Sequence, residues 1–297
     1  MNYISLLKQS AEKTGNCVCM GLDPILDFLP QKEKLQDTII SFFEVLFNKM
    51  KEKGLCPSAF KPNIGYYACY DSPFENDFSG SVALAHLIKM IKTIFSEVPI
   101  ILDSKRGDIA RSSLNYAIEA FDVWKADCTT VSPYMGSDSI EPFIKEKYIE
   151  KGIYILNRTS NKGAKDFQNL NILEEIDSSD APLYLAISKK IVSYLQEGYS
   201  VGAVVGATGL EELKTIASFF TKAIQGGVPL LIPGVGSQGG SAKEVISILR
   251  ECNYDLSLVR INSSSSLTHP WKSKDVPSDY VEQCLNNIEN LINESRI

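Results

Sequence analysis

Short runs of apolar residues recur along the chain, and turn residues bound each of them. Eight such runs lie at residues 17–23, 58–63, 99–105, 128–133, 152–160, 202–208, 229–236 and 256–264. Several are apolar at successive positions rather than at alternate ones, which is typical of strands buried on both faces of a parallel sheet. The pattern therefore predicts eight buried, parallel strands.

Between these runs the apolar residues recur with helical spacing. The predicted helices include 38–50, 81–95, 114–124, 209–220 and 241–252. Alternation of eight strands with helices over 297 residues is the pattern of a (β/α)8 barrel. We therefore predict an α/β fold of one domain, a (β/α)8 TIM barrel that spans residues 1–297, with an N-terminal and a C-terminal helix packed on the barrel.

Two further observations bear on this architecture. A doubly wound open sheet is the alternative, but no G-x-G-x-x-G motif follows the first predicted strand, which weakens it. Two long polar stretches, 71–80 and 161–180, follow the second and fifth strands, at the end where such barrels build their active sites. Each stretch is compatible with a mobile lid or with a plain surface loop.

Composition excludes several classes of protein. The formal net charge is −6, so we expect no nucleic-acid partner, and local positive charge must bind any anionic ligand. No apolar stretch reaches about 18 residues, so we expect no membrane span, and the amino terminus lacks the pattern of a signal peptide. The seven cysteines are scattered without a C-x-x-C pair, and only two histidines occur. These counts predict reduced thiols, no metal site and a cytoplasmic protein.

The third predicted strand ends in an unusual cluster of charges. Asp103 and Lys105 lie two residues apart, so their side chains share one face of the strand, whereas Arg106 points to the other. Asp108 lies beyond the strand, in a turn that Gly107 permits. A solvated ion pair at a strand end, worth at most about 1 kcal/mol, is the simpler interpretation of this cluster taken alone.

Other predicted strands deliver polar residues at the same end. Asp23 follows the first strand, Lys61 and Asn63 end the second, and Thr159 and Ser160 end the fifth. The carboxyl ends of barrel strands meet at one mouth, so these side chains should converge with the charged cluster. Convergence of several polar strand ends indicates a ligand site rather than a set of solvated surface charges.

The charged cluster suits acid or electrostatic catalysis, and the turns after the last two strands are candidates for phosphate binding. A lysine between carboxylates keeps its positive charge, and it suits a proton donor or a cation aimed at developing negative charge. The small, hydroxyl- and glycine-rich turns at 233–240 and 262–266 follow the last two strands. Such turns are compatible with tight backbone geometry alone, but at this position in a barrel they frequently bind phosphate through backbone N–H groups.

The stretch DSKRGDI resembles the D-x-K-x-x-D signature of the orotidine 5′-phosphate decarboxylases, in particular their longer bacterial branch, where DxKRxDI is usual. The stretches GLDP, FKPNIGYY, VSPYMGSDSIEPF, NRTSNKGAKDFQ, VVGAT, PGVGSQGG and INSS follow the family's order over nearly the whole chain. The resemblance implies a (β/α)8 barrel homodimer that converts orotidine 5′-monophosphate to UMP and CO2, the last step of de novo pyrimidine synthesis. It also implies that the reaction needs neither a metal nor a cofactor.

The same resemblance implies a role for individual residues. Asp103 would lie beside the substrate carboxylate, and Lys105 would protonate C6 of the pyrimidine. Lys61 and Asp108 would complete an alternating charge network, with Asp108 reaching into the partner subunit's site. The other implied contacts are Asp23, Asn63 and Ser112 around the ribose (which Lys61 and Asp108 would also meet), Thr159 and Ser160 at the pyrimidine edge, and Gly236, Gln238 and Ser264 around the phosphate.

One residue departs from the family pattern. Ser265 stands where the family usually has an arginine that grips the phosphate. Arg158 and Lys162, around the end of the fifth strand, are candidate substitutes, whereas Arg260 lies inside a strand and is less suited. Two alternatives stay open: a Mg²⁺-dependent sugar-phosphate enzyme of the same barrel superfamily, such as a hexulose-phosphate synthase, and a non-catalytic nucleotide-binding protein.

Overall fold

Eight parallel strands form the central sheet of the computed structural model, which describes residues 1–173, 180–236 and 239–297. They are β1 (Val18–Leu22), β2 (Ala59–Pro62), β3 (Ile101–Arg106), β4 (Cys128–Val131), β5 (Gly152–Arg158), β8 (Val201–Val205), β9 (Leu230–Pro233) and β10 (Val259–Ser263). Each lies within or overlaps one of the eight predicted runs, so the predicted strands are confirmed.

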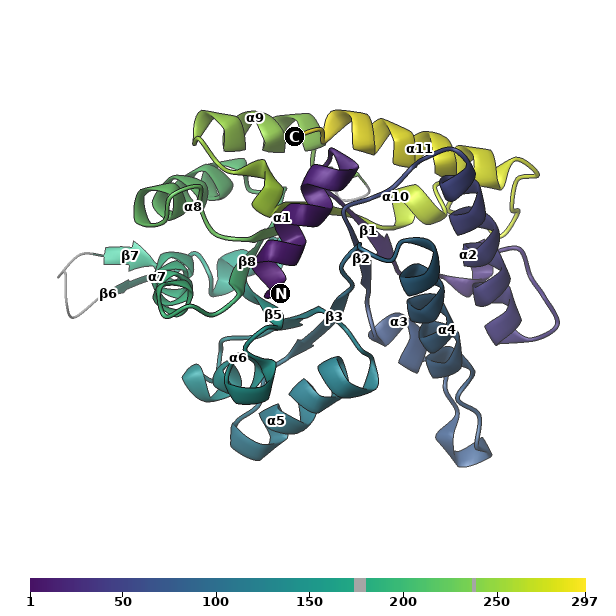
Figure 1. Cartoon of the computed structure of the whole chain (residues 1–297), viewed down its shortest axis with the longest axis horizontal. Helices are drawn as coiled ribbons and strands as arrows, with labels where there is room; N and C mark the ends of the chain where they lie inside the picture. The colour runs from purple at the N-terminus through teal and green to yellow at the C-terminus, as the bar shows by residue number, and fades with distance from the viewer. Residues whose placement is uncertain (174–179, 237–238) are drawn as a thin grey trace.

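The sheet closes into a barrel. Its strand order is β2-β1-β10-β9-β8-β5-β4-β3, and all seven of these neighbouring pairs are parallel. Parallel bridges from Phe60 to Ile100 and from Asn63 to Asp103 join the two end strands, β2 and β3. The predicted single-domain (β/α)8 barrel is confirmed, and the open-sheet alternative is wrong (Figure 1).

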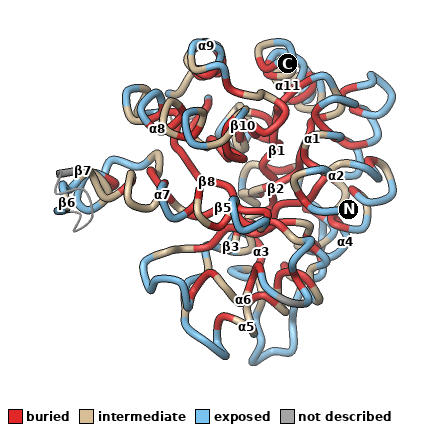
Figure 2. Tube along the Cα trace, turned by 60° about the vertical axis from the view of Figure 1, so that its left-hand side comes forward, coloured by how far each residue is buried: buried red, intermediate tan, exposed pale blue. Residues whose placement is uncertain are grey.

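Helices surround the barrel in the order that the sequence predicts. The larger ones are α2 (Leu35–Glu52), α4 (Ser79–Ile94), α5 (Ala110–Ile118), α7 (Leu183–Gln196), α8 (Leu210–Ala223), α9 (Ala242–Glu251) and α11 (Tyr280–Glu294). Short helices, α3 (Gly65–Ala68), α6 (Glu141–Ile144) and α10 (Ser265–Thr268), lie in loops that follow strands. Figure 2 shows the buried strands at the centre and the exposed outer faces of the helices. No helix in the described part of the chain is long and apolar enough to cross a membrane.

Helix α1 (Tyr3–Thr14) covers the amino-terminal end of the barrel (Figure 1). The Tyr3 ring packs edge-on against Tyr154 of β5 at a centroid distance of 6.1 Å. Arg260 of β10 is fully buried beneath this helix and donates to the backbone carbonyls of Leu7 and Ser58. This end of the barrel is therefore filled by side chains, which leaves the carboxyl ends of the strands for a ligand.

The polar stretch after β5 contains a small ribbon of its own. Strands β6 (Asn171–Leu173) and β7 (Asp180–Pro182) pair antiparallel around residues 174–179, which lie outside the described part. The stretch after β2 holds a single turn of 3₁₀ helix, Pro73–Glu75. Both interpretations of these stretches, as a mobile lid and as a plain surface loop, stay predictions.

Candidate active site

A pocket of about 520 Å³ opens at the carboxyl ends of the barrel strands. Every one of the eight strands, or the loop that follows it, contributes to the wall: Asp23, Lys61, Asn63, Asp103, Lys105, Thr130, Leu156, Thr159, Ser160, Gln168, Val204, Leu231, Pro233, Gly234, Val235, Asn262, Ser263 and Ser264. A larger groove, about 780 Å³, lies outside the barrel along α5 and α6, but none of the charged strand-end residues line it. The chemistry therefore points to the pocket inside the barrel mouth. No group of three or more His, Cys, Asp or Glu residues suited to a metal ion occurs in the described part.

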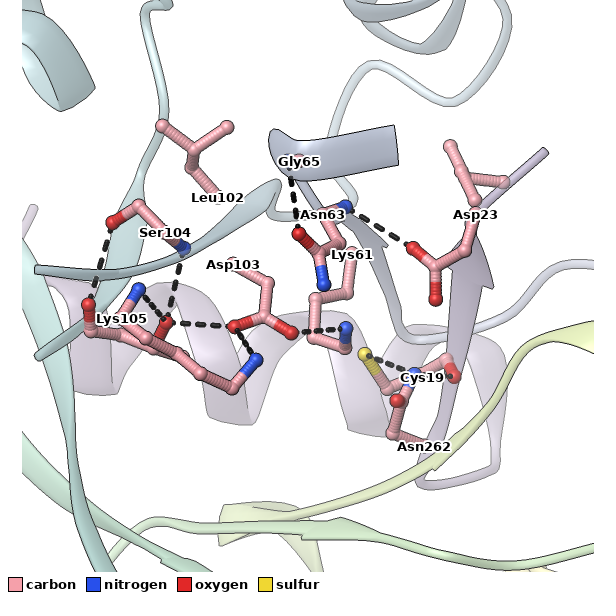
Figure 3. Close-up of polar contacts among 12 residues, drawn as sticks. Cys19, Asp23, Lys61, Asn63, Gly65, Leu102, Asp103, Ser104, Lys105 and Asn262 are labelled. Carbon is pink, nitrogen blue, oxygen red and sulfur yellow. Dashed lines mark hydrogen bonds and ion pairs between the residues drawn. The ribbon is translucent and has the colours of Figure 1, made fainter. Parts of the chain in front are cut away.

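A lysine–aspartate–lysine array crosses the base of this pocket (Figure 3). Lys61 Nζ lies 2.8 Å from Asp103 Oδ2, and Lys105 Nζ lies 2.6 Å from Asp103 Oδ1. The side chains of Lys61 and Asp103 are almost fully buried, whereas that of Lys105 is 49% exposed and is free to meet a ligand. Lys105 reaches Asp103 across an irregular part of β3, where the strand loses its register with β4.

Burial and charge act in opposite directions on the two buried members of the array. Burial alone would lower the pKa of Lys61, but the negative charges of Asp103 and Asp23 outweigh it and hold that pKa above its ordinary value. Burial alone would raise the pKa of Asp103, but the charges of Lys61 and Lys105 outweigh it and hold that pKa well below its usual range. Both groups therefore stay ionised at neutral pH.

The second carboxylate of the pocket, Asp23, is held by the backbone just after β2. The Asn63 backbone N–H donates to Asp23 Oδ1 at 3.1 Å, and the Asn63 side chain accepts a hydrogen bond from the Gly65 N–H at 3.0 Å (Figure 3). Asp23 is half-buried and also contributes negative charge at Lys61. The pocket thus alternates acidic and basic groups from β1 to β3.

Comparison with known proteins agrees with this geometry. The model of the orotidine 5′-phosphate decarboxylase / HUMPS family matches residues 58–251. An orotidine 5′-phosphate decarboxylase of Ralstonia pickettii is 33% identical over 276 residues, which cover 93% of this chain and 92% of the relative. One from Herpetosiphon aurantiacus is 34% identical over 249 residues, covering 84% of this chain and 85% of the relative. The chain belongs to the orotidine 5′-phosphate decarboxylase family.

Solved structures support the same assignment. The structure of Leishmania donovani OMP decarboxylase superposes with a TM-score of 0.72 and 28% identity, covering 99% of each chain. Leishmania donovani UMP synthase superposes with a TM-score of 0.74 and 29% identity, covering 98% of this chain and 56% of that one. The barrel described above is therefore the fold of this decarboxylase family.

Asp108 of the decarboxylase motif and Ser112, which follows it, lie outside the pocket of their own chain. Asp108 follows β3, is partly exposed, and accepts a hydrogen bond from the Ile109 N–H at 2.7 Å. Ser112 is exposed near the start of α5. Neither residue lines the pocket. The barrel thus brings together the predicted residues Asp23, Lys61, Asn63, Asp103, Lys105, Thr159, Ser160 and Ser264, but Asp108, Ser112, Gly236 and Ser265 do not line the pocket.

The expected phosphate end of the pocket is formed by β9, β10 and the turns after them. Ser264 lines the pocket, and its Oγ is buried without a hydrogen-bond partner. Gly236 has φ +87°, and a Cβ at this position would lie 2.7 Å from Ser266 Oγ, so glycine is required. Ser265, the first residue of α10, lies just beyond the lining residues. Gln238 lies outside the described residues.

None of the three candidate cations lies free at this end of the pocket. The Arg158 guanidinium pairs with Glu212 at 2.9 Å and donates to the Thr159 carbonyl, so it fixes the loop after β5 instead. Arg260 is buried at the opposite end of the barrel. Lys162 is exposed and does not line the pocket. Phosphate binding by Arg158 would require the loss of its ion pair with Glu212.

Several polar residues of the pocket were not singled out from the sequence, among them Thr130, Gln168 and Asn262. Thr130 of β4 contacts Asp103, Gln168 bonds to Thr159, and Asn262 of β10 donates to the Cys19 carbonyl. Gln168 and Asn262 lie within stretches that resemble the family, so the motifs contained them. Thr130 lies inside a predicted buried strand, where a hydroxyl is the only signal of a polar role.

Proposed function

We propose that this chain decarboxylates orotidine 5′-monophosphate to UMP and CO2, the last step of de novo pyrimidine synthesis. The observation that carries the proposal is the Lys61–Asp103–Lys105 array at the base of the barrel pocket, with one ammonium group accessible. The relatives described above, which bear this enzyme name and match the chain over most of its length, support it.

The array suits the electronic demand of this reaction. Loss of CO2 breaks the C6–carboxylate bond and leaves the electron pair on C6, where resonance stabilises it poorly. The Lys105 ammonium would stabilise that carbanion and then donate its proton to C6, and water would reprotonate the lysine. The ionised Asp103 would hold Lys105 in place and repel the substrate carboxylate, while contacts to the distant phosphate supply binding energy.

The hydrogen bonds that Asp103 already accepts disfavour the Mg²⁺-dependent alternative. Its Oδ2 accepts from Lys61, and its Oδ1 accepts from both Lys105 and Thr130. A metal ion at this carboxylate would have to displace an ammonium group from it. The array therefore fits charge-assisted decarboxylation better than metal-assisted enolate chemistry.

The direct test is the absorbance change of orotidine 5′-monophosphate on addition of the purified protein, in the presence of excess EDTA. We expect UMP to form at the same rate with and without the chelator. Activity that requires added Mg²⁺ would favour the metal-dependent alternative. Nucleotide binding without turnover would favour the non-catalytic one.

We infer further that the enzyme is a homodimer in which Asp108 completes the partner's site. Asp108 lies outside its own pocket, next to Ile109, whose side chain is exposed. Tyr134 and Met135, which follow β4, are exposed apolar residues as well. Exposed apolar side chains around a functional charge are typical of an interface.

Shared sites predict that inactive variants complement each other. Lys105→Ala and Asp108→Ala should each be weak alone, and a mixture that has exchanged subunits should regain activity. Each mixed dimer contains one site with both native residues, so an equal mixture should reach about a quarter of the wild-type kcat per site. If subunit exchange is verified and activity stays low, Asp108 acts within its own chain.

The phosphate end predicts an effect of restoring the family's arginine. Ser265→Arg should lower KM about tenfold or more, because a guanidinium fork makes stronger hydrogen bonds to a dianion than a hydroxyl does. Lys162→Ala should raise KM only if that lysine folds over the phosphate. An unchanged KM for both variants would mean that backbone N–H groups and hydroxyls alone hold the phosphate.

We place the enzyme in the cytoplasm. All seven cysteines are free thiols, and four of them are buried in the barrel or its helices. Reduced cysteines are typical of that compartment. The proposed substrate is a small nucleotide, so no macromolecular partner other than a second copy of the chain is required.

A further inference from the structure

Strand β3 loses register with β4 at the catalytic residues. Leu102 pairs with Thr129, and the next pair is Arg106 with Val131. Residues 103–105 of β3 therefore lie opposite a single residue of β4, Thr130. Lys105 adopts a left-handed backbone conformation with φ +46°, which is rare for a residue with a side chain. Such a conformation persists only where its surroundings enforce it.

The side chain of Thr130 supplies the hydrogen bonds that the irregular ladder lacks. Its Oγ1 accepts from the backbone N–H of Ser104 at 3.1 Å and from that of Lys105 at 2.9 Å. The same Oγ1 donates to Asp103 Oδ1 at 2.8 Å. Thr130 is almost fully buried, so water does not compete for these bonds.

The Thr130 hydroxyl uses its full hydrogen-bonding capacity in this arrangement. A threonine hydroxyl has two lone pairs and one hydrogen. Both lone pairs are used by the Ser104 and Lys105 N–H groups, so the hydrogen is directed to Asp103. One group thereby holds both the backbone that presents Lys105 and the carboxylate that Lys105 faces.

We propose that Thr130 is a positioning residue for the catalytic lysine. It fixes the bulge that aims Lys105 into the pocket, and it orients Asp103 so that Oδ1 faces Lys105 while Oδ2 faces Lys61. The proposal rests on the proposed decarboxylase function. Because the hydroxyl has no lone pair left for a ligand, its loss should act on kcat and not on substrate binding.

Thr130→Val removes the hydroxyl and keeps the shape of the side chain. We expect kcat to fall about 10- to 100-fold with KM within about twofold of the wild type, the loss that accompanies one hydrogen bond to a charged group. Thr130→Ser retains the hydroxyl and should recover most of kcat. Thr130→Cys, whose thiol is a weaker donor and acceptor, should lie between the two.

Thr129 offers a matched control. It is the preceding residue of β4, is equally buried, and also bonds to β3, through the Leu102 carbonyl at 2.9 Å and Ser104 Oγ at 2.8 Å. Within the described part of the chain, its side chain makes no hydrogen bond to Asp103 or Lys105. Thr129→Val should therefore lower the unfolding midpoint as Thr130→Val does, and should keep kcat near the wild-type value.

The results for these variants test the positioning role of Thr130 separately from the decarboxylase function. Wild-type kcat in Thr130→Val, or an equal loss of kcat in Thr129→Val, would overturn the role of Thr130 while leaving the decarboxylase intact. If Thr130→Val does not fold, the order Thr, Ser, Cys in kcat decides the question. A crystal structure of Thr130→Val gives a reading that needs no turnover: we expect Lys105 to leave its left-handed conformation, and an unchanged Lys105 would contradict the proposal.

Discussion

Lys105→Ala is expected to lower kcat on the order of 10⁴-fold or more, because the ammonium group would supply both the proton for C6 and the charge that stabilises the carbanion. The protein should stay folded. The Lys105 side chain is 49% exposed, and Asp103 keeps Lys61 as a buried partner. Asp103 is buried, so the loss of one of its charge-assisted hydrogen bonds should lower the free energy of unfolding by about 1.5–3 kcal/mol, which is less than the stability of a typical domain. Steady-state kinetics and urea unfolding measure the two effects.

Lys8→Ala is the matched control for this variant. Lys8 Nζ pairs with Asp255 Oδ2 at 2.8 Å, its side chain is 42% exposed, and the pair lies at the opposite end of the barrel. Its removal should leave kcat unchanged. A second measurement distinguishes a proton donor from a fixed cation: wild-type enzyme should exchange the C6 hydrogen of UMP in D2O, and Lys105→Ala should not. A Lys105→Ala variant with kcat within about tenfold of the wild type would contradict the assignment.

Asp103→Asn is expected to lower the free energy of unfolding by about 3 kcal/mol, because the buried Lys61 ammonium loses its hydrogen-bonded carboxylate and keeps only the negative charge of Asp23. The penalty falls on Lys61, because its side chain is only 4% exposed to solvent and Asp103 is its hydrogen-bonded partner. The substitution keeps the shape of the side chain, so packing around it should change little. Urea unfolding of the two proteins measures the difference.

The double variant Lys61→Met/Asp103→Asn tests the cause of that loss. It removes both buried charges, and replacement of a buried ion pair by apolar groups of similar size is often neutral. We therefore expect the double variant to recover most of the lost stability while remaining inactive. A double variant no more stable than Asp103→Asn would show that packing, and not the unpaired lysine, causes the loss.

The same pair predicts how the loss depends on pH. The pKa of Asp103 is lowered from its ordinary value of 3.8, so its ionised form contributes stability above about pH 4, and the contribution fades as the pH falls through the folded-state pKa. The pKa of Lys61 is raised, so its contribution is lost only as the pH rises beyond about 10.5. The difference between wild type and Asp103→Asn should be constant between about pH 5 and 9 and should shrink in acid.

Features that depend on short-range periodicity could be predicted from the sequence. Successive apolar residues reflect burial on both faces of a strand, so each predicted run contains or overlaps one of the eight barrel strands. The polar residues at the ends of several predicted strands predicted the pocket. The bulge at residues 103–105, in contrast, departs from the regular two-residue period. The length of the chain and the number of strand–helix units then left the barrel as the favoured architecture.

Other features were decided only by the tertiary structure. At the bulge, the Thr130 hydroxyl of the neighbouring strand accepts the backbone hydrogen bonds of Ser104 and Lys105 in place of backbone carbonyls. Thr130 lies 26 and 25 residues from these two residues in the sequence. Arg158 is a candidate phosphate cation from its sequence position, but Glu212, 54 residues later, holds its guanidinium. In both cases the side chain's partner comes from a different strand or helix. Local pattern identifies which residues are polar and which end of a strand they occupy, whereas hydrogen-bond geometry and charge pairing are settled only when the closed barrel brings its strands side by side.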